Sequence, residues 1–165
     1  MTTADQLSEL LYASFPIEPL PRFFWLDDGE QPVGDIPEEL LKRIAHRPWA
    51  NVTMWDWTMT GAHASTARVY LDPNAFRYYL PSLLVGALRE IGYLDWALEC
   101  LLPAGRKRRT TGKWWTEFRS GFSEQQRAAI CAYLKGVRST RGDSIDPANQ
   151  QLLDEAEVIW ILSGR

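Results

Sequence analysis

Histidine and cysteine, the residue types that most often carry metal or nucleophilic chemistry, are rare and widely spaced here. His46, His63, Cys100 and Cys131 make up the full set, and they do not follow the short spacings of zinc ligands. Both cysteines fall within apolar helical patterns, where a thiol behaves as a small hydrophobic group. We therefore predict no metal site, no cysteine nucleophile and no disulfide framework.

Carboxylate pairs, which can perform general acid–base catalysis, occur as Asp27-Asp28 and Glu38-Glu39. Adjacent helical residues do not face each other, and glycosidic chemistry needs two carboxylates facing across a cleft. The phosphate-binding patterns GxGxxG and GxxxxGK[ST] and the nucleophile pattern GxSxG are absent. The sequence thus predicts no catalytic residue and no cofactor. An enzyme without a recognisable motif, with a groove near residues 16–34, stays an alternative.

The densest group of functional side chains combines cations with two indoles. Basic side chains can neutralise phosphates and aromatic rings can stack on unpaired bases, whereas a protein partner would use the same residue types as contact points. A third interpretation is a solvated basic loop that leads into two core tryptophans. The group consists of Arg106, Lys107, Arg108, Arg109, Lys113, Trp114 and Trp115.

Charge is strongly segregated along the 165 residues, although the net charge is only −3. Residues 1–60 carry 4 basic and 10 acidic side chains, and residues 100–141 carry 10 basic and 2 acidic ones. Either the basic segment meets an anionic partner, or the acidic segments fold against it. Trp25, Asp27 and Asp28, in the proline-rich segment 16–34, are further candidate partner-binding residues; the alternative is that this segment crosses the core.

The positions of these residues depend on helices, which the apolar spacing predicts at 4–15, 35–47, 73–91, 94–101, 124–137 and 146–160. Capping patterns begin at Thr3, Asp35, Asp72, Ser123 and Asp146. A kink or a restart is expected at Pro81. Residues 49–71 are ambiguous between helix and a small β-hairpin that would put Trp55 and Trp57 on one face. We predict a mainly α fold of five to six helices in a single domain, residues 1–165.

The composition is that of a globular chain, with 45% hydrophobic and 24% charged residues. No run approaches the ~20 apolar residues of a membrane helix, and the N-terminus lacks the basic and apolar regions of a signal peptide. We therefore expect a cytoplasmic protein that does not contact membranes.

Three stretches carry a resemblance: LDPNAFRYYLPSLLVGALRE (71–90), FSEQQRAAICAYLKGV (122–137) and AEVIWI (156–161). They resemble a family of small bacterial proteins of unknown function that share an AFxYYLPxxL helix, an F…Q…A…YL helix and a C-terminal Trp. The resemblance implies a mainly helical core and supplies no catalytic residues. Tyr78 lies off the apolar face of its helix and can project into a groove.

These observations predict a non-enzymatic protein-interaction module, in its most concrete form an immunity-type or antitoxin-like protein that neutralises a partner protein. Complementary charge would speed such an association. The alternative is a nucleic-acid-binding accessory protein that uses residues 106–115.

Overall fold

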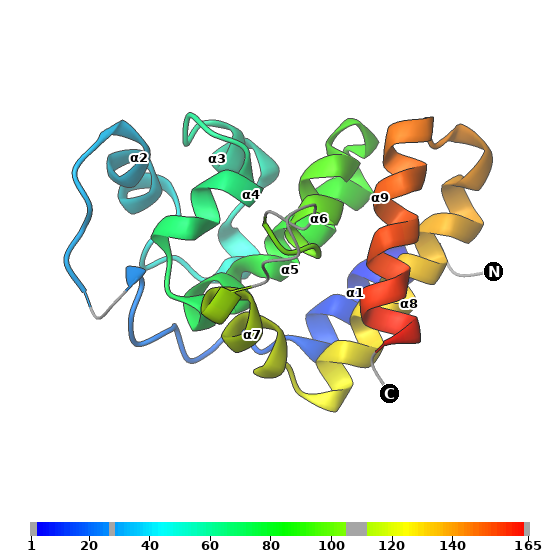
Figure 1. The fold of residues 1–165 in the computed structure, drawn as a ribbon, viewed down its shortest axis with the longest axis horizontal. Helices are drawn as coiled ribbons and strands as arrows, with labels where there is room; N and C mark the ends of the chain where they lie inside the picture. The colour runs from blue at the N-terminus through cyan, green and yellow to red at the C-terminus, as the bar shows by residue number, and fades with distance from the viewer. Residues whose placement is uncertain (1–2, 27–28, 105–111, 164–165) are drawn as a thin grey trace.

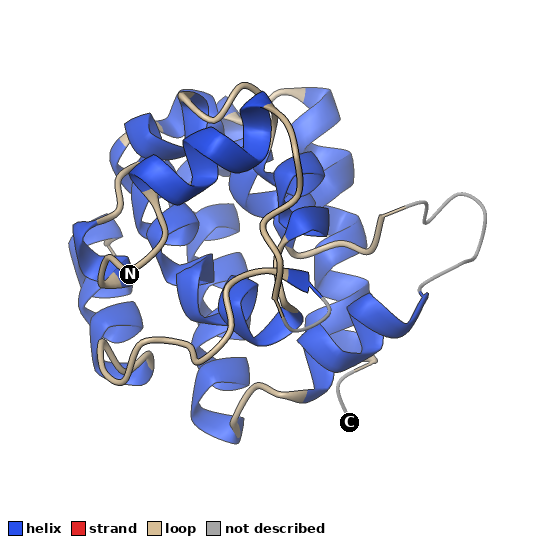
Figure 2. Cartoon of the chain, turned by 90° about the vertical axis from the view of Figure 1, so that its left-hand side faces the viewer, coloured by secondary structure: helices blue, strands red, loops and turns tan. Residues whose placement is uncertain are grey.

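The computed structural model describes residues 3–26, 29–104 and 112–163, which form helices and loops (Figure 1). Within these residues Figure 2 shows no strand, and β-type pairing is limited to an isolated antiparallel bridge between Trp25 and Leu71. The predicted mainly α fold is confirmed. The α-helices are α1 (Ala4–Ser14), α2 (Asp35–Arg43), α3 (Met54–Thr58), α4 (Ala64–Ala67), α5 (Pro73–Arg89), α6 (Leu94–Cys100), α7 (Gly112–Ser120), α8 (Glu124–Arg141) and α9 (Pro147–Glu157).

The described chain also contains short helical turns between or after these helices. They are the 3₁₀ turns η2 (Trp49–Asn51), η3 (Arg68–Tyr70), η4 (Ile91–Tyr93) and η6 (Gly142–Ser144), and the π-helical turn η7 (Val158–Leu162).

The helix starts follow the predicted capping patterns with one exception. Capping boxes open α1 and α8, and Asp72 and Asp146 cap α5 and α9 with proline as the first helical residue. The prediction for Asp35 was wrong. The N-cap of α2 is Gly34, whose φ of 138° lies where glycine is favoured. Asp35 is instead in the first turn, where its carboxylate interacts favourably with the helix dipole.

The segment 49–71 is helical, so the hairpin alternative is wrong. A capping box that the sequence analysis missed begins α3: Thr53 Oγ1 accepts from the backbone N–H of Asp56, and the Asp56 carboxylate accepts from the N–H of Thr53. On a helix, positions two apart point in different directions. Trp57 is accordingly fully buried, whereas 65% of Trp55 is exposed.

Helix α5 is the centre of the molecule. In Figure 1 it lies between α2, α3 and α4 on one side and α1, α8 and α9 on the other, and it contacts α1, α3, α6 and α7. The helix runs through Pro81 without a restart, and every residue from Tyr79 to Leu88 is buried. Both faces of α5 therefore position the surrounding helices, and its C-terminal end reaches the surface at Arg89 and Glu90.

None of the helices in the described part of the chain is long and apolar enough to cross a membrane.

Candidate functional site

The predicted partner-binding residues fall into two groups, those that the structure describes and those that lie outside the described residues. Of the first group, Lys113 is exposed on α7 and pairs with Glu117 across 3.5 Å. The structure describes Lys113, Trp114, Trp115 and Trp25, whereas Arg106, Lys107, Arg108, Arg109, Asp27 and Asp28 lie outside the described residues.

The three tryptophans of this set have the contacts of core residues. Trp115 is buried against Trp160, and Trp25 is buried in the bridge to Leu71. Trp114 is half-buried, and its Nε1 donates to the Leu71 carbonyl at 2.8 Å. These contacts favour anchoring roles for the indoles. That this set binds a partner stays a prediction.

The described acidic and basic segments compensate each other in part. Arg138 of α8 contacts Asp154 and donates from Nε to Glu157 at 2.7 Å, so the acidic C-terminal segment meets the basic one. Arg119 and Arg127 donate to the carbonyls of Ile159 and Phe122. These three arginines are therefore engaged within the fold.

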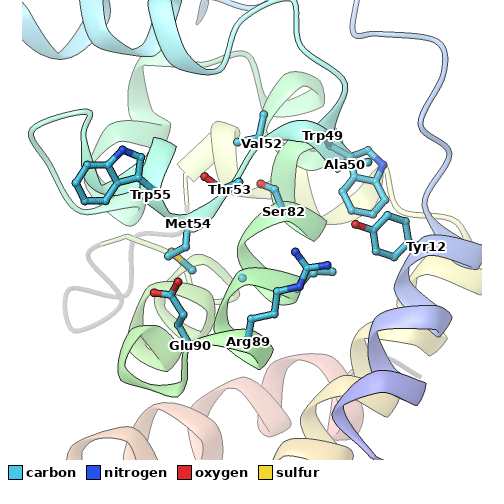
Figure 3. A pocket seen from close by; sticks show the side chains of 12 residues that line it. Tyr12, Trp49, Ala50, Val52, Thr53, Met54, Trp55, Ser82, Arg89 and Glu90 are labelled. Carbon is cyan, nitrogen blue, oxygen red and sulfur yellow. The ribbon is translucent and has the colours of Figure 1, made fainter.

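A cleft of about 290 Å³ lies where α1, the η2–α3 segment and the end of α5 meet (Figure 3). We call it the tryptophan cleft. Figure 3 shows Trp55 on one side, Tyr12 and Trp49 on the other, and Arg89 extending from α5 into the space between them. The Tyr12 and Trp49 ring centroids are 4.8 Å apart. Two segments distant in sequence thus place aromatic rings on either side of a guanidinium that a third segment supplies.

Local packing holds the walls of the cleft in place. The backbone N–H of Trp49 donates to Tyr78 Oη at 3.1 Å, and Trp49 Nε1 donates to the Pro16 carbonyl at 3.2 Å. Gly86 lets α3 approach α5 closely, because a Cβ there would lie 3.0 Å from Met54 Cε. Trp55 therefore lies on a helix that begins with a capping box and packs against α5 through Met54.

The polar groups of the cleft differ in how many hydrogen bonds and ion pairs they already form. Ser82 is buried and fully engaged: its Oγ accepts from Trp57 Nε1 at 2.9 Å and donates to the Tyr79 carbonyl. Arg89 and Glu90 are exposed at the mouth, and neither forms an ion pair or side-chain hydrogen bond with any described residue. The cleft thus offers free charge only at its rim, above an aromatic and apolar wall.

Ser65, His63 and Asp95 form a second arrangement that the sequence analysis did not identify. Ser65 Oγ lies 2.7 Å from His63 Nδ1, and His63 Nε2 lies 3.6 Å from Asp95 Oδ2. The sequence of hydroxyl, imidazole and carboxylate resembles the catalytic triad of a serine hydrolase. However, Nδ1 also accepts the backbone N–H of Ser65, as the N-cap of α4. The amides of Thr66 and Ala67 both donate to the His63 carbonyl, so neither is free to bind an oxyanion. This arrangement is a helix cap.

The cysteines and possible metal ligands offer little chemistry in the described residues. Burial raises the pKa of the Cys100 thiol to about 12, and burial also raises the pKa of Cys131. Neutral thiols are poor nucleophiles. Nowhere in the described ranges do three His, Cys, Asp or Glu side chains gather in a way that could hold a metal ion.

None of the residues that line the tryptophan cleft was predicted from the sequence as a candidate site. One signal was present: the Thr53…Asp56 capping pattern places Trp55 and Trp57 on different helix faces and so leaves one indole without a core position. No comparable signal connects Tyr12 or Arg89 to this place, because they come from other helices.

Comparison with known proteins gives a family but no activity. A family model described as a family of unknown function, DUF6714, matches residues 35–161, which include Trp49, Trp55 and Arg89 but not Tyr12. No curated protein and no solved structure matches the chain. Because the family model matches well over half of the sequence, the chain belongs to DUF6714, a family of unknown function.

Proposed function

We propose that the chain is a protein-binding module that holds one anchoring side chain of its partner in the tryptophan cleft. The observation that carries this proposal is Trp55: 65% of this indole is exposed, on a short helix that begins with a capping box and packs Met54 against Gly86. A partner that covers a large exposed apolar ring beside a concave surface removes apolar area from water, which favours binding.

The residue types of the cleft support a protein partner. Trp, Tyr and Arg are the types enriched at interface hot spots, because each combines a large area with a polar group. All three types meet here in Trp55, Tyr12 and Arg89. The cleft, at about 290 Å³, is at the small end of the range of about 300–1,000 Å³ for small-molecule sites. It suits a single side chain better than a whole ligand.

The charge of Arg89 indicates which residue should flank the side chain that occupies the cleft. Arg89 has no described carboxylate partner, and a guanidinium forms its strongest hydrogen bonds with carboxylates. The segment that fits is therefore an apolar or aromatic side chain flanked by an Asp or Glu. The neighbouring Glu90 disfavours a second acidic residue beside it and so orients the segment.

Binding and neutralising a toxin as an immunity-type protein is one specific form of this function. It would require that the partner insert such a segment into the tryptophan cleft. Purifying this protein with a co-produced toxin, and losing the complex on Trp55→Ala, would establish that form.

The proposal is tested by selecting displayed random peptides on the full chain. We expect enrichment of sequences with an aromatic or aliphatic residue next to Asp or Glu. Truncating a hot-spot residue costs about 2 kcal/mol or more, roughly thirtyfold in Kd, so Trp55→Ala and Arg89→Ala should weaken the selected peptides by that factor.

Two controls match these variants. Leu162 is 67% exposed and lies outside the cleft, so Leu162→Ala removes an equally exposed apolar side chain. Lys135→Ala removes an exposed cation on α8. Both should bind the selected peptides as the unchanged chain does. Equal losses in the control and cleft variants would refute the proposed site.

A further inference from the structure

A larger groove of about 450 Å³ lies apart from the tryptophan cleft and shares no lining residue with it. We call it the strap groove. One wall consists of Phe15, Pro16 and residues 18–22. Asn74, Arg77 and Tyr78 of α5 form another wall, and Gly121 and Gln126 close the groove at the α7–α8 connection. The volume lies within the range of small-molecule sites.

Arg77 is a half-buried cation in this lining. Its guanidinium donates to the carbonyls of Glu117 and Phe118, at 2.6 and 3.0 Å, and to Asn74 Oδ1 at 2.7 Å. Burial lowers the pKa of Arg77 from its ordinary value. Within the described residues no carboxylate is within ion-pair distance of it. Three of its five N–H groups are used, so two have no described acceptor.

Gly121 brings this guanidinium against the backbone of the groove. A Cβ at Gly121 would lie 2.0 Å from Arg77 Cζ, so any larger residue would displace the side chain. The Arg77 guanidinium also lies over the Phe122 ring, with Cζ 5.5 Å from the ring centroid. The position of the cation is therefore fixed before any ligand binds.

The amide side chains of the groove also present donors. Asn74 Oδ1 already accepts from Arg77, and Gln126 Oε1 accepts from the backbone N–H of Ser123 at 3.0 Å. Their NH₂ groups have no described acceptor. Tyr78 is occupied in both directions: its hydroxyl donates to the Ile17 carbonyl and accepts from the Trp49 N–H. Among the side-chain amides and the hydroxyl beside Arg77, the free hydrogen-bonding capacity thus consists of donors.

The rest of the lining is apolar with a small positive balance. Phe15, Leu20 and the prolines 16, 19 and 21 supply carbon surface. The charged residues are Arg22 and Arg77 against Glu18. Amide donors and a net positive charge beside carbon walls fit an amphipathic anion that binds at Arg77, away from the Glu18 carboxylate.

We propose that the strap groove binds a small monocarboxylic acid with a hydrocarbon body. The carboxylate accepts hydrogen bonds from Arg77 and from the amide groups of Asn74 and Gln126. The hydrocarbon body lies against Phe15, Leu20 and the prolines of the strap.

The test compares octanoate with octan-1-ol, which has the same chain and no charge, by NMR titration of the full isotope-labelled chain. We expect octanoate to shift the amides of Leu20, Gly121 and Gln126 and to bind at least about tenfold more tightly than the alcohol, since hydrogen bonds to charged groups are the stronger ones. Equal binding of the two, no binding of octanoate, or shifts confined to other regions would overturn the proposal.

Charge variants beside Arg77 make the test specific. Arg77→Gln should abolish the preference for octanoate, but Arg77 also caps α7. Gln126→Glu keeps the Oε1 acceptor of the capping box and adds a negative charge to the groove, so octanoate affinity should fall about tenfold or more. Gln125→Glu adds the same charge on the adjacent, exposed position outside the groove and should leave the affinity nearly unchanged. Identical affinities of these two variants would contradict the site.

Discussion

Arginine and tryptophan side chains at single positions satisfy the carbonyl groups that helix ends leave without partners. At the C-terminus of α6, Arg68 donates to the carbonyls of Cys100 and Leu102, at 3.2 and 2.7 Å, and Trp160 Nε1 donates to that of Leu101 at 2.7 Å. Three successive carbonyls are thus satisfied from distant segments. An unsatisfied buried carbonyl is costly, so Arg68 and Trp160 have structural roles at this helix end.

Two buried tyrosines should respond oppositely to loss of their hydroxyl. Tyr133 Oη is buried with no described hydrogen-bond partner, so Tyr133→Phe should leave the free energy of unfolding unchanged or raise it by up to about 1 kcal/mol. Tyr79 Oη donates to the Arg47 carbonyl at 2.8 Å, so Tyr79→Phe should lower it by about 1–3 kcal/mol. Urea unfolding measures both; a larger loss for Tyr133→Phe would contradict this reasoning.

At the scale of elements, close approach at glycines sets how helices pack. Gly86 allows α3 to lie on α5, and Gly136 allows α1 to lie on α8, because a Cβ at Gly136 would be 2.5 Å from Leu7 Cδ1. Leu7 is itself buried. The spacing of α1 against α8 therefore depends on the absence of one methyl group.

Gly136→Ala should lower the free energy of unfolding by about 1–3 kcal/mol through overpacking, although alanine favours an isolated helix by about 1 kcal/mol. The matched control is Gly92→Ala, where an added Cβ meets nothing within 4 Å. The control should change stability by no more than about 0.5 kcal/mol. Denaturant titrations compare the two, and equal stability of both variants would show that Leu7 adjusts without cost.

Across the whole molecule, buried acidic groups predict loss of stability in alkali. Burial raises the pKa of Cys100 from 9.0 to about 12, and burial raises the pKa values of Tyr79 and Tyr133 as well. As the pH rises above about 9, the unfolded chain loses protons that the folded chain retains, so the free energy of unfolding falls. Urea midpoints measured from pH 7 to pH 11 should fall above pH 9, and Tyr133→Phe should make that fall shallower. A midpoint independent of pH would contradict the burial of these groups.

The parts of the fold that could be predicted are those determined by local sequence. Capping by Thr3, Asp72, Ser123 and Asp146 fixes helix starts within a few residues of chain, and apolar spacing identifies the long helices. Helix α3 is only five residues long, too short for periodicity to distinguish it from a strand. The tryptophan cleft could not be predicted, because Tyr12, Trp55 and Arg89 meet only through tertiary packing.

The central claim, that the tryptophan cleft binds an apolar side chain next to a carboxylate, is tested most directly by a charge exchange. One peptide selected on the unchanged chain is titrated calorimetrically against that chain and against Arg89→Glu. We predict that Arg89→Glu weakens the peptide about thirtyfold or more, and that replacing the acidic residue of the peptide by Lys restores much of the affinity for Arg89→Glu alone. If the Lys peptide binds both chains equally weakly, Arg89 does not contact that residue and the proposed site is wrong.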